Sequence, residues 1–394
     1  NGLEKRPKLR FPGFDEPWEI CTAEELFQNV TDKNHPDETV LTIVQGKGTL
    51  PREQAGRNIH YDDASLSNYK MVQKGDFIIH LRSFEGGLEM ANENGIVSPA
   101  YTILRGKKPH SSRFYEAYFH TDEFVNHVLS KSVEGIRDGR QISYDAFKWL
   151  GLPYCSPSEQ AKIAELFSVL TKRIEKQTVL VDSLKKYKRG VVRSLLSPED
   201  CKLKNAQWSR DTMGNLGSFI KGAPLSKADI SKTGTPFILY GELYTTYHEV
   251  ITSVVRKTES EVDSVYRSIV GDVLIPTSGE TPEEISTASC VMLPGVILAG
   301  DLNIFRSSKV DGRIMSYILN HIVNGSIARV AQGKSIVHVQ ASEIAKIEIS
   351  YPDPETQDRI VGVLEAISSR VEYCEKELDN LTRLRSSLLQ QLFI

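Results

Sequence analysis

A pattern of apolar residues, spaced alternately by four and three, occurs twice in this chain and limits the folds that it can adopt. Aligning Gln160 with Gln357, an offset of 197 residues, superimposes the two stretches over their full length. The patterned positions of the first stretch are Ile163, Phe167, Leu170, Ile174, Gln177, Val181, Leu184, Lys188, Val191 and Leu195. Their counterparts are Ile360, Leu364, Ile367, Val371, Cys374, Leu378, Leu381, Arg385, Leu388 and Leu392. This alternation averages about 3.5 residues per turn, which is the period of a coiled-coil interface.

Each stretch predicts one long helix. Neither has an internal proline, and each opens with proline and acidic residues, which suit the first turn of a helix. Residues 151–196 hold nine basic and four acidic residues, a charge of +5. Residues 353–394 hold five and eight, a charge of −3, so the two helices favour each other over self-pairing. We expect an intramolecular antiparallel coiled coil; the alternative is two unrelated surface helices of separate domains.

The rest of the sequence repeats as well, which predicts two related α/β halves. Gly75-Asp76 and Gly271-Asp272 each precede an apolar strand, and we interpret both aspartates as turn residues. Arg105 and Arg306 each end a later strand. Each half continues with a predicted helix (114–129 and 314–323), a glycine loop (137–142 and 331–336) and a strand (146–150 and 344–349).

We therefore predict a mixed α/β (α+β) fold made by tandem duplication. Residues 1–152 and 197–351 form two globular domains, and the helices at 153–196 and 352–394 join them. The length of 394 residues suits this organisation.

Composition narrows the class of protein. The net charge of −3 does not indicate a strongly basic nucleic-acid binder, so any DNA contact would use local basic patches. The five cysteines show no pairing or ligand spacing, as in a reducing compartment. No apolar run approaches membrane-spanning length, and we expect a cytoplasmic protein.

Motifs for catalysis are missing. Gly333-Lys334-Ser335 resembles the end of a phosphate-binding loop, but Ala328 stands where that loop needs its first glycine. The nine histidines show no metal-ligand spacing, and no cluster of carboxylates suggests a nuclease. We predict no catalytic residue, no metal site and no enzyme activity in this chain.

Together these motifs resemble the specificity subunit of a Type I restriction–modification system. The N-terminal arm (residues 9–18), the Gly-Asp strands, the helix starts at 157–160 and 354–357 and the helix ends at 191–196 and 388–393 carry the resemblance. Thr356 departs from it, because the glutamate of the Glu159-Gln160 pair is missing from the second helix.

The resemblance implies a function. Each globular domain would be a target-recognition domain that reads one half of a bipartite, asymmetric sequence in double-stranded DNA. The helices would set the spacing and help to dock two DNA-adenine methyltransferase (modification) subunits, and restriction subunits would join the assembly. S-adenosylmethionine, ATP and Mg would be bound by those partners, with no cofactor in this chain. The alternatives are a stand-alone DNA-binding protein, an enzyme with an unrecognised site and a coiled-coil scaffold.

Candidate contact residues follow from the side chains that read bases and phosphates. The candidates for DNA binding are Arg82, Ser83, Lys107, Lys108, Arg140 and Gln141 in the first half and Thr277, Ser278, Lys334 and Ser335 in the second. For each, the alternative is an ordinary solvated surface residue. Leu180, Tyr187 and Val192 are expected to be exposed on the first helix and to contact the methyltransferase, although Tyr187 could instead pack in the coiled coil.

Overall fold

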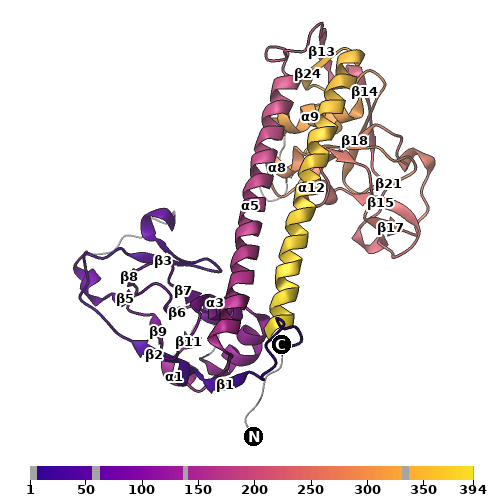
Figure 1. The fold of residues 1–394 in the computed structure, drawn as a ribbon. Helices are drawn as coiled ribbons and strands as arrows, with labels where there is room; N and C mark the ends of the chain where they lie inside the picture. Colours follow the sequence, from indigo (N-terminus) through magenta and orange to yellow (C-terminus); the bar gives the residue numbers. More distant parts are fainter. Residues whose placement is uncertain (1–6, 56–62, 136–140, 331–336, 394) are drawn as a thin grey trace. The chain divides into compact units, whose positions relative to one another are not determined.

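The chain divides into two compact units, each of which combines a mixed α/β head with half of two long helices. The computed structural model describes residues 7–55, 63–135, 141–330 and 337–393. Unit 1 comprises Asn1–Thr178 with Lys376–Ile394, and unit 2 comprises Val179–Glu375. The helices are α5 (Pro157–Leu196) and α12 (Pro354–Phe393) (Figure 1). We call residues 7–156 head 1 and residues 197–353 head 2.

The long helices confirm the prediction from the repeated pattern. Both have 40 residues, and their ends lie 197 positions apart at either terminus. Every position of the 4-3 pattern is buried or half-buried. In unit 1, Phe167 stacks on Phe393, and the later residue Arg173 pairs with the earlier residue Glu377 at 2.7 Å. The two helices therefore run antiparallel.

Head 1 is built on a four-stranded antiparallel sheet in the order β2-β9-β6-β7. The strands are β2 (Phe27–Val30), β9 (Thr102–Gly106), β6 (Phe77–Ile79) and β7 (Glu89–Met90). Two-stranded pairs surround it: β1 (Glu19–Thr22) with β12 (Gly151–Tyr154), β3 (Leu41–Val44) with β4 (Gly48–Pro51), β5 (Lys70–Val72) with β8 (Gly95–Val97), and β10 (Val133–Glu134) with β11 (Gln141–Ile142). The short helices are α1 (Ala23–Leu26), η1 (Arg52–Ala55), η2 (Asp63–Asn68), α2 (Ser83–Gly86), α3 (Ser112–Phe119), η3 (Glu123–Val128), η4 (Leu129–Ser132) and α4 (Tyr144–Phe147).

Head 2 repeats this sheet and extends it. Its order is β14-β22-β18-β20-β16, with strands β14 (Gly217–Lys221), β22 (Leu302–Ser307), β18 (Asp272–Pro276), β20 (Ser289–Val291) and β16 (Val250–Ile251). The other strands are β13 (Trp208–Thr212) with β24 (Glu348–Pro352), β15 (Thr235–Leu239) between β17 (Arg256–Thr258) and β21 (Ile297–Ala299), and β19 (Ser278–Gly279) with β23 (Val337–His338). The short helices are α6 (Met213–Leu216), η6 (Lys227–Asp229), α7 (Glu242–Thr245), η7 (Ser264–Tyr266), α8 (Pro282–Ile285), α9 (Gly312–His321), α10 (Asn324–Val330) and α11 (Ala341–Ile344). The shared order β2-β9-β6-β7 and β14-β22-β18-β20 confirms the tandem duplication.

Two local predictions were wrong. Residues 146–150 and 344–349 are not continuous strands, because α4 and α11 occupy the first part of each stretch and the strands β12 and β24 begin later. The Ser143 hydroxyl caps α4 by accepting from the Ala146 N–H at 3.2 Å, which a strand would not allow. The helix expected at 114–129 ends at Phe119 and resumes as a π-helix at Glu123.

The Gly-Asp pairs are turn residues, as expected. Gly75 and Gly271 have φ angles of +94° and +96°, a conformation that favours glycine. Asp76 is buried and accepts from Arg105 Nη2 at 2.6 Å, and Asp272 accepts from Arg306 Nε at 2.8 Å. Each turn is thus tied to the strand, β9 or β22, whose second-last residue is the arginine.

The starts of the long helices share one contact and differ in another. Gln160 accepts from the Ser111 N–H at 2.9 Å, and Gln357 accepts from the Asp311 N–H at 2.7 Å, where Ser111 and Asp311 cap α3 and α9. The preceding residues differ. Glu159 accepts from Arg10 Nη2 at 2.8 Å and from the Trp18 indole at 3.1 Å. Thr356 instead donates its hydroxyl to Asp353 at 2.8 Å.

Candidate nucleic-acid interface

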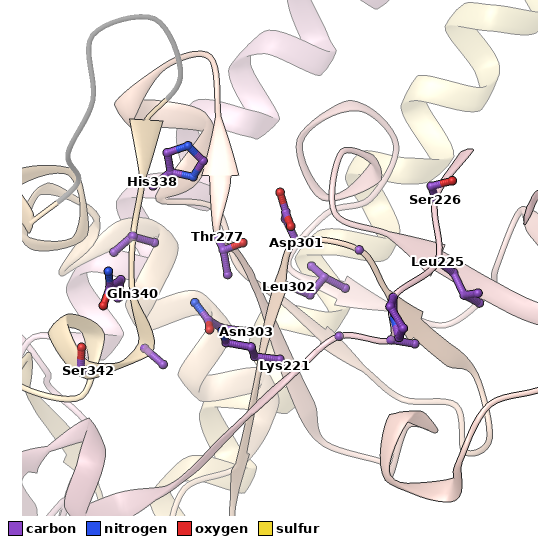
Figure 2. Close-up of a pocket in the computed structure, with 16 residues that line it drawn as sticks. Lys221, Leu225, Ser226, Thr277, Asp301, Leu302, Asn303, His338, Gln340 and Ser342 are labelled. Atoms are coloured by element: carbon purple, nitrogen blue, oxygen red, sulfur yellow. The ribbon is translucent and has the colours of Figure 1, made fainter. Parts of the chain in front are cut away.

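A groove of about 890 Å³ opens on head 2, where two strand ends meet two loops (Figure 2). It is lined by the start of β22, the end of β14 with the residues after it, Thr277 after β18, and the segment that begins at the end of β23. The polar residues that line it are Lys221, Ser226, Thr277, Asp301, Asn303, His338, Gln340 and Ser342. This mixture of donors and acceptors, with little net charge, suits hydrogen bonding to the edges of bases more than neutralisation of phosphates.

Asn303 is the most unusual member of this groove. It pairs with Ile275 in the sheet, is only 1% exposed, and its amide nitrogen Nδ2 has no hydrogen-bond partner among the described residues. A buried polar group without a partner costs free energy, so such groups are uncommon without a functional reason. Asn303 therefore offers an unused hydrogen-bonding group to a ligand of the groove.

The backbone around the groove is firmly held. The Thr277 N–H donates to the Asp301 carbonyl at 2.8 Å, and the Val339 N–H donates to the Thr277 carbonyl at 3.0 Å. The Ser278 hydroxyl donates to the Asp301 carboxylate at 2.8 Å. These bonds fix Thr277 and Asp301 at the groove before any ligand arrives, which lowers the entropy cost of binding.

Head 1 has a corresponding strand end with different side chains. His80 follows β6 directly, its ring lies 6.4 Å from that of Tyr101, and its Nε2 has no partner among the described residues. Burial lowers the pKa of His80 to about 4, so the imidazole is neutral at pH 7. The neighbouring Lys70 donates to the Tyr101 carbonyl at 2.5 Å. Both heads thus carry an unused polar nitrogen at the same end of the same strand pair.

The predicted DNA-contact residues of head 1 lie in different environments. Arg82 and Gln141 are exposed. Ser83 is buried, and its hydroxyl accepts from the His80 N–H at 2.9 Å, so its side chain does not face solvent. Lys107 donates to the Glu24 carbonyl at 2.7 Å, and Lys108 lies 3.5 Å from the Cys21 sulfur. Arg140 lies outside the described residues.

In head 2, Thr277 lines the groove, whereas Ser278 is buried against Asp301. Lys334 and Ser335 lie outside the described residues. The structure therefore brings Thr277 together with residues that the sequence did not single out, above all Asn303. A polar residue inside the apolar strand Leu302–Ser307 was the available signal.

The residues of α5 that were predicted to contact a partner differ in exposure. Leu180 and Tyr187 are exposed, at 39% and 60%, so Tyr187 is not packed inside the coiled coil. The prediction that Val192 is exposed was wrong, because it is fully buried in the core of unit 2 with Ile360. Tyr187 borders an open apolar hollow with Gly190 and Val191.

No helix in the described ranges is long and apolar enough to cross a membrane. Within the same residues, no group of three or more His, Cys, Asp or Glu side chains is arranged to hold a metal ion.

Comparison with solved structures places this fold. The chain resembles the S subunit of the Type I restriction–modification system from M. genitalium with a TM-score of 0.63, 15% identity and coverage of 99% of both chains. It also resembles a chain from a study of complex assembly and conformational transition of the type I R-M system, with a TM-score of 0.55, 16% identity, and coverage of 98% of this chain and 99% of that chain. No protein-family profile and no curated protein sequence matches it. The chain therefore has the fold of a Type I restriction–modification S subunit.

Proposed function

We propose that this chain is the DNA sequence-recognition subunit of a Type I restriction–modification complex. The observation that carries the proposal is the fold match to an S subunit over 99% of both chains. The repeated heads and the antiparallel helices support it, because a bipartite DNA target needs two readers held by one frame.

Each head would read one half of the target. The groove of head 2, with Thr277 and Asn303, would contact one half-site. The strand end of head 1, with His80 and the exposed Arg82, would contact the other. Because an amide and an imidazole present different donor and acceptor patterns, the two half-sites should differ in sequence.

Two exposed apolar positions support docking of modification subunits on the helices. Tyr187 on α5 is 60% exposed, and Leu384, 197 residues later on α12, is 47% exposed. Equivalent positions on two equivalent helices suit two copies of one partner, with aromatic and leucine side chains as anchors. The adenine-methylating activity, S-adenosylmethionine, ATP and Mg would belong to the partner subunits, within the cytoplasm.

The test is methylation mapping. This chain and its cognate modification subunit are co-expressed in a host that lacks adenine methylation, and modified bases are then located by single-molecule sequencing. The expected result is methyladenine in both halves of a bipartite motif, lost when this chain is omitted. A stable complex with an active methyltransferase but no sequence-specific methylation would contradict the proposal and favour a scaffold or a stand-alone DNA-binding protein.

We also propose that the helices set the distance between the half-sites. Removing seven residues from each helix at equivalent positions shortens each by about 10 Å, at about 1.5 Å per residue. The motif gap should then shrink by about three base pairs, at about 3.4 Å each, or assembly should fail while both heads stay folded. An unchanged gap in an active complex would refute this role.

A further inference from the structure

Each long helix carries one basic residue in its otherwise apolar pattern, and each of these lies in a cavity of its own unit. Lys188 of α5 borders a cavity of about 240 Å³ in unit 2. Arg385 of α12, 197 residues later, borders a cavity of about 200 Å³ in unit 1. The helix surface of the two cavities is also equivalent, with Thr171 and Glu175 in one and Ser368 and Glu372 in the other.

In unit 2 the protein neutralises this basic residue itself. Lys188 Nζ lies 2.7 Å from Glu249 Oε2, and His321 Nε2 lies 2.7 Å from Glu249 Oε1. Lys188 also lies over the ring of Tyr317, 5.4 Å from its centroid. In the cavity of unit 2, the carboxylate of Glu249 thus already compensates the charge of Lys188.

In unit 1 no carboxylate takes this place. Arg385 forms no ion pair among the described residues, and its buried Nε has no hydrogen-bond partner there. His120 directly follows α3, much as His321 is the last residue of α9, and the carboxylate beside it is Glu89. Glu89 lies 3.8 Å from His120 Nε2, accepts from the N–H groups of Gly46 and Gly48 at 2.7 and 2.8 Å, and forms no ion pair with Arg385.

The remaining charges leave this cavity positive. Its basic residues are Arg113, Lys172 and Arg385, and its acidic residues are Glu116 and Glu175. Arg113 is already paired with Glu116 at 2.7 Å. The cavity of unit 2, by contrast, has three basic residues (Lys185, Lys188, Arg189) and three acidic ones (Glu249, Glu372, Glu375).

We propose that the cavity of unit 1 binds a phosphate group, with Arg385 as its principal ligand and Lys172 and Thr171 beside it. A buried guanidinium Nε without an acceptor is unfavourable, and the guanidinium fork of the half-buried Arg385 matches the geometry of phosphate oxygens. The internal comparison identifies the missing group as an oxyanion, because Glu249 supplies one at the equivalent place in unit 2. This inference does not depend on the proposed function.

Titration of the full chain with inorganic phosphate, followed by ³¹P NMR, tests the proposal. The wild type should bind one phosphate with a Kd of about 1 mM, as expected for a single small anion. Arg385→Gln should weaken binding by about tenfold or more, since it removes a charge-assisted bidentate contact. Arg383→Gln is the matched control, because it removes the same charge from the same helix at an exposed position outside the cavity.

No saturable phosphate binding by the wild type, or equal weakening by Arg383→Gln and Arg385→Gln, would overturn the site. If Arg385→Gln fails to fold, Arg385→Lys keeps the charge without the fork and should weaken binding measurably. Competition with a duplex oligonucleotide then identifies the source: displacement of phosphate indicates the DNA backbone, and no displacement indicates a free phosphate compound. Both results keep the site, whatever methylation mapping shows.

Discussion

The two heads share one sheet order but fill it with different side chains. The core of unit 1 is aromatic, with Phe27, Phe77, Phe114, Tyr115, Tyr118, Phe119 and Phe124 in contact. Helix α3 of unit 1 supplies several of these rings, whereas the equivalent helix α9 of unit 2 supplies mainly aliphatic residues, Ile314, Met315, Ile318 and Leu319. What the heads share is a small set of polar anchors: the Asp–Arg pair and the glutamine at each helix start. These polar contacts recur although the core side chains differ, and we infer that they do more than the identity of the core residues to define the common topology.

Alanine substitutions in the two cores should have the largest effect on stability, and each should destabilise its own unit. Phe119→Ala should destabilise unit 1 by about 4 kcal/mol, and Leu319→Ala should destabilise unit 2 by about 3 kcal/mol, because both side chains are fully buried and the aromatic ring is larger. Hydrogen exchange of peptides from each unit, measured across a urea series, checks this. Equal loss of protection in both units from either variant would show that the cores are not independent.

The shared anchors should give matched effects. Asp76→Ala and Asp272→Ala each leave a partly buried arginine without its carboxylate, at 25% and 21% exposure. We expect each substitution to lower the free energy of unfolding by about 2–3 kcal/mol. This loss is smaller than for a fully buried pair, because water reaches the guanidinium. Thermal unfolding monitored unit by unit measures it, and a large effect in one head with none in the other would contradict the anchor interpretation.

Two buried carboxylates should respond to acid in opposite directions. The pairs with His321 and Lys188 lower the pKa of Glu249 from 4.5 to about 2 despite its burial. A lowered folded-state pKa gives stability that is present above about pH 4.5 and is lost as the pH falls towards about 2. Burial raises the pKa of Glu89, so acid should favour the folded state of unit 1 at that residue.

Glu249→Gln isolates the first of these effects. The variant should be about 2 kcal/mol less stable than the wild type at pH 7, and the difference should shrink steadily below about pH 4.5. Urea unfolding at a series of pH values measures it. A difference at pH 2.5 as large as that at pH 7 would assign the effect to packing instead of charge.

The smallest effect on stability is expected in the groove. Asn303→Leu replaces an amide whose nitrogen has no partner among the described residues, so the free energy of unfolding should change by less than about 0.5 kcal/mol. The methylation motif should nevertheless change in one half only. His80→Leu is the counterpart for the other half. If either variant alters both halves, the division of reading between the heads is wrong.

The long helices could be predicted from the sequence, whereas the groove could not. A 4-3 pattern over 40 residues is a strong signal for a long helix. Each copy also has one basic residue at the same position of the pattern, Lys188 in the first and Arg385 in the second. The groove depends on short segments that meet only through tertiary pairing, such as Asn303 opposite Ile275. Val192 was misjudged because it lies off the coiled-coil stripe and packs into the core of unit 2 instead.

The contact made by Gln160 and Gln357 has a consequence for inheritance. Because each glutamine accepts from a backbone N–H at the start of the helix α3 or α9, this contact depends on the backbone of the head and not on its side chains. Recombination between genes at the segments that code for the long helices would then exchange whole heads while keeping this contact. Under the proposed function, such an exchange would change the DNA target in one genetic event, with no accumulation of point mutations in the groove.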